Sequence, residues 1–496
     1  MTSGWNGKEN YMNGKNLKKA AVLSAAAVLL TGCQTADSTH EPDSSRIGIG
    51  ELIGSLYVDA YSSAAESSAP ESSWDNADES GYDTSPDYSE PDHFQAPEGG
   101  HLTILSWTGN SETRDMVDHF IKDNGYSESD IEIKELGDYS EMARSEYRNY
   151  LYGDGDADII VLDNDISDEF YESQLCMPLS DIGLFKSDFT QAFNYTLELG
   201  TNQSGVFMGV SPIACPGGFV YRADLAREYL GVTSPEEMQE LIGSWDGFVD
   251  TGRKLYSASG QKVSLASTYD GVWQAYKGAA LPWVDSESRL NFSYSAEHFF
   301  DIVDSLRYNG GVCGALQWDM SWYDSISDGS ALGEFLPTWG LTDIEYSQLS
   351  QMCDNGQYEM AFCKGPSAYY WGGTIFAVAN KCDDPTLARE FLEYTCLDAD
   401  SMREYAEESG AFVNNRAVVS SMSSYNSLLG GEDYYKWLVE SADEVSAYGH
   451  TQYDSEIAYS FISSVKNYID GTFTRDDAIR EFKLSVVEKY PSLYID

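Results

Sequence analysis

The chain has few basic residues and few histidines for its length. Its 496 residues include 30 Lys and Arg against 81 Asp and Glu, which gives a formal net charge of −51. This balance argues against nucleic acid as a partner, because binding to a phosphate backbone requires clustered cations. Only six histidines are present, and two of them, His40 and His93, lie in an acidic, Ser-rich stretch. A histidine-based nucleophile relay or metal site is therefore poorly supported.

The sequence also lacks the short motifs of common enzymes and cofactor sites. It contains no Gly-x-Ser-x-Gly, His-Glu-x-x-His, Walker A, Rossmann glycine or Cys-x-x-Cys pattern. The acidic run at 154–158 resembles the start of an EF-hand loop, but Ile159 and Asp165 stand where that loop requires Gly and Glu. We therefore expect no cofactor, no metal and no catalytic residue. A glycosidase stays open as an alternative, because that chemistry needs only two carboxylates.

Long apolar runs are scarce, and the one that is present predicts export. Residues 20–30 (AAVLSAAAVLL) cover about half of the ~20 residues that span a bilayer, and three lysines precede them, as in a signal peptide. The next residues, LTGC at 30–33, resemble a bacterial lipobox. Residues 1–33 are therefore predicted to be a lipoprotein signal peptide, with Cys33 as the lipidated residue.

Residues 34–99 contain fifteen Asp or Glu and one Arg. Such a segment cannot bury enough apolar surface to offset its ordering entropy, so we expect a disordered tether. The predicted location is the extracellular face of the cell membrane, held by the lipid on Cys33. A long tether favours a Gram-positive envelope; in a Gram-negative cell the protein would be periplasmic.

Seven cysteines remain after Cys33 is set aside. Because seven is odd, a complete disulfide framework is impossible without a free or intermolecular thiol. We expect mostly buried, unpaired thiols, with one disulfide possible.

From His101 onward, buried-strand patterns alternate with amphipathic-helix patterns: HLTILSW, SETRDMVDHFIKDNG with Ser111 as expected N-cap, DIEIKEL, YSEMARSEYRNYLYG and ADIIVLD. This order predicts an α/β fold with a parallel sheet that is covered by helices on both faces. In such sheets ligands bind beyond the carboxyl ends of the strands. Those ends carry the candidate ligand-binding residues Trp107, Asn110, Asp163 and Asn164.

Aromatic residues are abundant, at 13% of the chain, with 35 Tyr and 11 Trp. Many rings beside many carboxylates and amides suit carbohydrate recognition, since rings cover the C–H faces of sugars and polar groups meet the hydroxyls.

Several segments, taken in order, resemble the extracellular solute-binding proteins of carbohydrate ABC importers, the maltose-binding-like family 1. The lipobox and tether precede LTILSW, which resembles the family's first strand, and ADIIVLDND resembles a later one. Tyr221-Arg222, followed by the helix around Trp245, resembles the family's crossover, and WGGTIFAVANKCDDPTLAREFLEYTC resembles its Gly-Gly turn, strand and helix. The resemblance covers roughly 102–490 and is weakest over 279–357.

The resemblance implies a two-lobed periplasmic-binding-protein fold of type II, with the ligand in the cleft between the lobes. Lobe one is expected to comprise 100–211 and 329–380, and lobe two 212–328 and 381–496. Closure about a hinge would bury a carbohydrate, of oligosaccharide size given the number of aromatic candidates, and present it to an ABC permease in the membrane. The chain is expected to act as a monomer.

The same resemblance adds site residues. The candidates are Tyr370, Trp371, Gly372 and Gly373 at the Gly-Gly turn, Trp273 and Tyr276 as an aromatic platform in lobe two, and Trp339 in the divergent middle, where Trp318 and Trp322 also lie. The glycines would let the backbone approach the ligand while Trp371 offers a stacking face.

Three other functions stay open. The same fold could bind a polyamine, an amino acid derivative or a metal chelate, in which case the cleft would present several carboxylates rather than rings and amides. A secreted glycosidase would turn over a glycoside. A surface adhesin would bind glycan or protein without closing.

Overall fold

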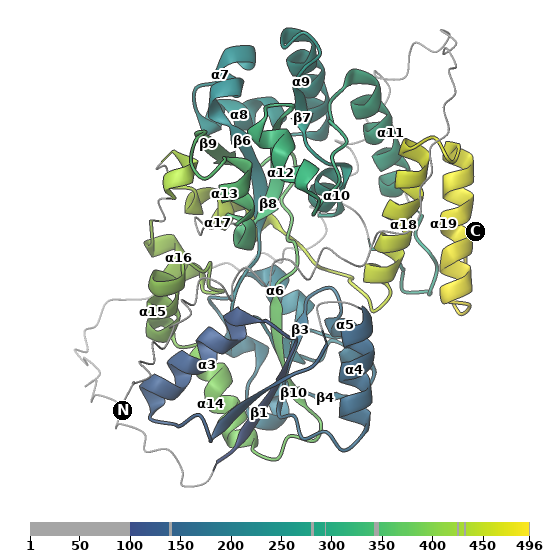
Figure 1. Cartoon of the computed structure of the whole chain (residues 1–496). Coiled ribbons are helices and arrows are strands. Elements are labelled where there is room, and N and C mark those ends of the chain that lie inside the picture. Colours follow the sequence, from purple (N-terminus) through teal and green to yellow (C-terminus); the bar gives the residue numbers. More distant parts are fainter. Residues whose placement is uncertain are drawn as a thin grey trace, which may run out of the picture. The chain divides into compact units, whose positions relative to one another are not determined.

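The computed structural model describes residues 100–137, 141–278, 282–292, 294–341, 347–423, 426–430 and 433–495, and these contain two β-sheets (Figure 1). Both sheets belong to the unit Gln95–Asp496. The predicted signal peptide, Cys33 and the predicted tether lie outside the described residues.

The first sheet has the strand order β2-β1-β3-β10-β4, with β5 also paired to β10. Its strands are β1 (Leu102–Ser106), β2 (Ile131–Glu135), β3 (Ile159–Asp163), β4 (Cys176–Met177), β5 (Gly209–Val210) and β10 (Thr374–Ala379). The continuous apolar runs of β1 and β3 are buried along their whole length, as expected for strands covered on both faces. β1 pairs in parallel with β2 and β3, whereas β10 runs antiparallel to β3, with Thr374 opposite Asp163.

Helices cover both faces of the first sheet, and the strand order explains why. The connections β1 to β2 and β2 to β3 step across the sheet in opposite directions, so right-handed crossovers place α3 and α4 on opposite faces (Figure 1). The helices that contribute buried residues to this core include α3 (Ser111–Asn124), α4 (Glu141–Tyr152), α5 (Ser167–Glu172), α6 (Asn194–Leu199), α14 (Pro385–Cys396), α15 (Ala399–Ser409), α16 (Arg416–Ser421) and α17 (Tyr435–Glu444), with the 3₁₀ turns η1 (Leu179–Ile182), η2 (Lys186–Asp188) and η4 (Ser427–Leu429) nearby. The α/β fold predicted from the alternating pattern is thus confirmed.

The second sheet has the order β7-β8-β6-β9. Its strands are β6 (Gly217–Arg222), β7 (Ser264–Ala266), β8 (Ala331–Pro337) and β9 (Met360–Cys363). Around it lie α7 (Ala223–Leu230), α8 (Pro235–Ile242), α9 (Trp245–Ala258), α10 (Tyr269–Lys277), α11 (Tyr294–Asn309), α12 (Met320–Ser327), η3 (Thr338–Gly340), α13 (Gln348–Met352), α18 (Asp454–Ile469) and α19 (Arg475–Lys489). β8 pairs in parallel with β7 and antiparallel with β6, so the fully buried β8 occupies the interior of this sheet.

The expected division into lobes needs correction in two places. Residues 329–380 were expected in lobe one, but β8 and β9 pair with β6 in the second sheet, contacts between residues far apart in the sequence. Residues from 381 onward were expected in lobe two, but α14 contacts α3 and buries Phe391 in the core of the first sheet. The C-terminal helices α18 and α19 do pack in the second core.

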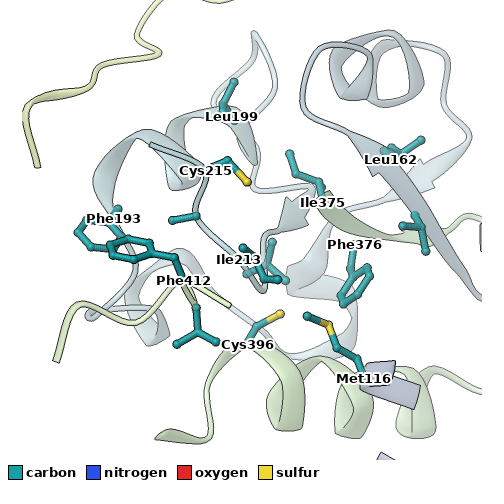
Figure 2. Packing of buried hydrophobic residues seen from close by; sticks show 14 of the residues in the cluster. Met116, Leu162, Phe193, Leu199, Ile213, Cys215, Ile375, Phe376, Cys396 and Phe412 are labelled. Carbon is teal, nitrogen blue, oxygen red and sulfur yellow. The ribbon is translucent and has the colours of Figure 1, made fainter. Parts of the chain in front are cut away.

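Three connecting segments run beside one another between the two sheets. The segment 211–216 leads from β5 to β6, the segment 364–373 leads from β9 to β10, and residues around Val413 lie against the first of them. Backbone hydrogen bonds join them: Trp371 N donates to Cys215 O at 3.2 Å, and Ala214 N donates to Phe412 O at 3.0 Å. Figure 2 shows Ile213 of the first segment between Phe412 and Phe376 in the buried core.

Two helix N-termini follow the usual residue preferences. α19 begins after the N-cap Thr474, and α14 has Pro385 in its first turn. The expected N-cap of α3 was wrong by one residue: Asn110, not Ser111, accepts the hydrogen bond from Thr113 N.

Seven cysteines lie in the described part of the chain, and all of them are free thiols. Five are buried, as expected, and Cys313 is exposed. Among the described helices, none combines the length and the apolar character needed to cross a bilayer.

A polar interface joins helices of the first sheet to the C-terminal helices. Arg144 of α4 pairs with Glu456 of α18 at 2.9 Å. His450, in the loop before α18, contacts Asp168 of α5 through Nδ1 at 2.5 Å and the carbonyl oxygen of Glu198 through Nε2 at 2.8 Å. Burial by itself would lower the pKa of His450, but the hydrogen bond and the charge of Asp168 raise it above its ordinary value.

We expect His450→Gln to destabilise the protein more at pH 5.5 than at pH 8.5. A group with a raised pKa in the folded state stabilises fully below its unfolded pKa, about 6.5 for histidine, and loses this contribution as the pH rises through the folded value. The loss at pH 5.5 should be about 1.5–3 kcal/mol, the usual value for a hydrogen bond to a charged group. Chemical denaturation at both pH values measures it.

A control is needed because Asp454 titrates in the same window, its pKa being raised by burial to about 7. In an Asp454→Asn background the difference caused by His450→Gln should keep its pH dependence. Equal destabilisation at both pH values would contradict a charged His450–Asp168 pair.

Candidate functional site

The Gly372–Gly373 turn lies directly against the end of β3. Asn164 fixes it twice: its side-chain Nδ2 donates to Gly372 O at 2.8 Å, and its backbone N donates to Gly373 O at 2.9 Å. Both glycines have positive φ, 62° and 117°. A Cβ on Gly373 would lie 2.5 Å from Asn164 Nδ2, so the close approach itself requires glycine.

Two buried acceptor atoms near this turn have no hydrogen-bond partner among the described residues: Asn164 Oδ1 and Glu112 Oε1. Glu112 stands in the first turn of α3 and hydrogen-bonds Thr374, the residue after the two glycines. Burial raises the pKa of Glu112 above its ordinary value, an effect that the Thr374 bond partly opposes. Buried acceptors without partners are costly, so both are candidates to receive donors from a ligand.

Three tryptophans meet beside the same turn. Trp339 Nε1 donates to Trp371 O at 3.0 Å, and the two rings lie 5.3 Å apart at 74°. Trp318 stacks on Trp339, with centroids 5.9 Å apart and planes inclined by 19°, and its ring lies 6.0 Å from that of Trp371. Trp371 is 9% exposed and Trp318 is 50% exposed, so the group presents ring surface to solvent mainly through Trp318.

Tyr370 and Asp163 complete this region. The half-buried Tyr370 ring stacks on Tyr195, with ring centroids 5.4 Å apart. Lys277 Nζ, at the end of α10, lies 5.8 Å from the centroid of the Tyr370 ring. Asp163, 5% exposed, accepts from Asp165 N at 2.8 Å. Burial raises the pKa of Tyr370 well above its ordinary value, and neighbouring aspartates add to the effect.

The structure brings together one part of the predicted site. Asp163, Asn164, Trp339, Trp371, Gly372 and Gly373 are neighbours through the contacts above, with Tyr370 adjacent to them in the chain. Trp107 lies at the end of β1, half-buried against the first core. Asn110 is 8% exposed; its Oδ1 caps α3 by accepting from Thr113 N, and its Nδ2 donates to Ser106 Oγ at the end of β1.

Trp273 and Tyr276 lie elsewhere, in the core of the second sheet. Each is 4% exposed. The Trp273 ring packs against Phe299 at 4.9 Å and Phe461 at 5.1 Å, and Tyr276 OH donates to Ser295 O at 2.6 Å. This placement favours a packing role over an aromatic platform for a ligand.

Sequence reasoning did not select Trp318 or Glu112. Trp318 was one of several tryptophans in the divergent middle of the chain, with nothing in the sequence to separate it from Trp322. Glu112 was an acidic residue in the first turn of a helix, where acids are common because they suit the helix dipole. Its position just beyond a strand's carboxyl end was the signal that could have selected it.

The described residues contain no group of three or more His, Cys, Asp or Glu that could hold a metal ion. What the site offers is ring surface, two glycine carbonyls that are already bonded, and unpartnered acceptors. Such a set binds polar groups and apolar faces together.

A model of the family described as bacterial extracellular solute-binding proteins matches residues 115–427. A curated relative, the arabinooligosaccharide-binding protein of Halalkalibacterium halodurans, is 19% identical over an alignment 273 residues long that covers 49% of this chain and 58% of the relative. The alignment thus spans little more than half the length of that relative.

Solved structures also resemble this chain. An extracellular solute-binding protein of family 1 has a TM-score of 0.68 at 16% identity, covering 79% of this chain and 99% of the other. The sugar-binding protein MalE of Xanthomonas citri has 0.64 at 13%, covering 78% and 96%. The galacto-N-biose-/lacto-N-biose I-binding protein of Bifidobacterium longum, solved with lacto-N-biose, has 0.61 at 17%, covering 81% and 100%. Identities this low show a shared fold.

We expect Gly373→Ala to lower the free energy of unfolding by more than backbone strain alone explains. Strain at a positive φ costs about 1–3 kcal/mol, and the new Cβ would also displace Asn164. Gly109→Ala is the matched control, because Gly109 has φ 84° and open space around its Cβ. Denaturation curves should show Gly373→Ala as the more destabilising variant. Equal effects would mean that the turn accommodates the new Cβ without any further loss of stability.

Proposed function

The chain belongs to the family of bacterial extracellular solute-binding proteins, and on this basis we propose that it captures a carbohydrate of oligosaccharide size and delivers it to an ABC import permease. The observation that carries the sugar assignment is the group Trp318, Trp339 and Trp371 beside the unpartnered acceptors of Glu112 and Asn164. The rings would cover C–H faces, and the acceptors would receive hydroxyl protons.

The chemistry of Glu112 supports a neutral ligand over a cationic one. Its raised pKa favours the protonated carboxyl relative to an ordinary glutamate, and a protonated carboxyl both donates and accepts as sugar hydroxyls require. A polyamine would need ionised carboxylates around it. The names of relatives agree with a sugar: one binds arabino-oligosaccharides, and another was solved with lacto-N-biose.

The working cycle that we propose is closure and release, without bond cleavage. The three connecting segments that pass between the sheets would absorb the hinge motion, as extended crossovers do in such proteins. The residues that contact the ligand would be Glu112, Asp163, Asn164, Trp318, Trp339, Tyr370 and Trp371, together with the backbone of Gly372 and Gly373. Closure would bury the ligand between these residues, and a monomer is sufficient for this cycle.

Binding is tested by calorimetry on the purified full chain with an arabino-oligosaccharide, a malto-oligosaccharide, lacto-N-biose and, as rivals, putrescine and spermidine. We expect at least one saccharide to bind and neither amine to bind. Binding of an amine alone would overturn the carbohydrate assignment. Release of a chromogenic aglycone from a glycoside would instead favour the glycosidase.

Trp318→Ala and Trp339→Ala should each weaken binding of the saccharide about tenfold, because loss of one stacking face removes on the order of 1.4 kcal/mol. Tyr308→Ala is the control, since the Tyr308 side chain is 90% exposed and lies on α11. Circular dichroism and the melting temperature should be nearly unchanged in Trp318→Ala. Unaltered affinity in both tryptophan variants would contradict the proposed site.

We further propose that the protein is a lipoprotein anchored through Cys33, which lies outside the described residues. Cys33→Ser should release the protein into the medium or leave it uncleaved. The variant would have no thiol to acylate, and stable anchoring to a membrane takes two or more acyl groups. Fractionation and the mass of the mature N-terminus measure this. Unchanged membrane retention and processing would contradict lipidation at Cys33.

A further inference from the structure

Glu334 is a carboxylate in the interior of the second sheet, and it is fully buried. It lies on β8 and accepts four hydrogen bonds. Thr268 donates to Oε2 from its backbone N at 2.9 Å and from Oγ1 at 2.8 Å, and Trp322 Nε1 donates to the same oxygen at 3.2 Å. Phe335 N donates to Oε1 at 2.8 Å. Four donors converge on two oxygens, a pattern that only an ionised carboxylate satisfies completely.

The bond to Trp322 links Glu334 to the group of tryptophans. Trp322 is 0% exposed, and its ring meets that of Trp318 edge to face, with centroids 4.8 Å apart and planes at 75°. Because the indole N–H is tied to the carboxylate, the ring cannot rotate without breaking that bond. The edge that Trp318 rests on is therefore fixed from the interior of the sheet.

Trp318 depends on such support. Its φ is 69°, which is unfavourable for a bulky residue, and its chain neighbours with large side chains, Leu316 and Met320, are 67% and 64% exposed. Its ring contacts among the described residues are with Trp322, Trp339 and Trp371. A strained and half-exposed ring keeps one orientation only where its neighbours are themselves immobile.

We propose that Glu334 is a positioning residue for the binding surface: its carboxylate holds the Trp322 indole, and this indole sets the orientation of the Trp318 ring. The inference rests on the proposed function in so far as Trp318 is a ligand-contacting residue. It adds to the proposed site a residue that does not contact the ligand. Glu334 affects the orientation of Trp318 from the interior of the second sheet, through Trp322.

Protonation of Glu334 gives a way to observe this route. Burial raises the pKa of Glu334 to about 7, and its hydrogen bonds oppose that rise. The other titratable groups coupled to its charge are Tyr369 and Cys313, and burial raises the pKa of each, so both stay protonated near pH 7. Adding a proton to Glu334 replaces an acceptor position by a donor and weakens its hold on the indole N–H.

The test is ¹⁹F NMR of the full chain labelled with 5-fluorotryptophan, recorded without any sugar between pH 5.5 and 8.5. Trp318→Phe and Trp322→Phe assign the two resonances. We expect both resonances to shift with one shared midpoint near pH 7. In Trp322→Phe, which keeps an aromatic ring but lacks the N–H, the Trp318 resonance should lose its titration.

A second variant separates positioning from a merely structural role. Thr268→Val removes one hydrogen bond to the ionised carboxylate, so it should raise the pKa of Glu334 and move the midpoints of Trp318 and Trp322 upward together. It will also destabilise the protein, because Thr268 is the N-cap of α10. Glu334→Gln should abolish both titrations. If this variant does not fold, Trp322→Phe and Thr268→Val still test the coupling between Glu334 and Trp318.

Either of two results would overturn the proposal: a Trp318 resonance that does not titrate with Trp322, or one that still titrates in Trp322→Phe. Because no sugar is present, the outcome is independent of the proposed function. A chain that binds no saccharide would leave the coupling intact, whereas absent coupling would refute the positioning role even in a chain that binds one.

Discussion

The hydrogen bonds between Asn164 and the Gly372–Gly373 turn determine where the rest of the site lies. They join the end of β3 to the start of β10, at the point where the chain returns from the second sheet to the first. The turn can approach β3 so closely only because Gly373 carries no Cβ. Once the turn is fixed, the carbonyl of Trp371 is fixed too, and it holds the indole of Trp339. The contact between Asn164 and the turn therefore sets the positions of the ring surface, the acceptors and the connecting segments.

Several titratable side chains are buried in or near the candidate site, and their hydrogen-bond partners differ. Glu334 is surrounded by donors, and His450 and Asp168 form a pair across helices. Glu112 has a free oxygen beside the site. Burying such a group is costly unless it is paired or hydrogen-bonded. Of these three carboxyl groups, only Glu334 has hydrogen bonds to both oxygens, whereas Asp168 and Glu112 each keep one buried oxygen without a partner among the described residues. In the proposed function, the free oxygen of Glu112 receives its partner from the ligand.

The sequence was sufficient for features that depend on local pattern. The apolar runs of β1 and β3 and the glycine turn could all be read from neighbouring residues. It was insufficient where partners are distant. The strand β8 was assigned to the wrong lobe because its pairing with β6 spans more than a hundred residues.

Aromatic residues show the same limit within a single helix. Trp273 and Tyr276 are three residues apart on α10 and share one face, a spacing that describes a core face and a ligand platform equally well. Phe299 of α11 and Phe461 of α18 pack against Trp273. Only this tertiary packing shows that the face belongs to the core. Trp318 is the converse case: it stands outside regular structure, and its role depends on rings contributed from three other places in the chain.

The strong negative charge and the chemistry of the site act over different distances. A net charge of −51 attracts cations from solution and has no first-order effect on a neutral sugar. If the ligand is a saccharide, its selection must come from short-range contacts: stacking on the tryptophans and hydrogen bonds to acceptors that are already desolvated. Such contacts discriminate by geometry, so the orientation of each ring matters more than its presence. A buried carboxylate that fixes one indole from the interior of the second sheet is then part of the specificity of the site, although it lies behind the surface that meets the ligand.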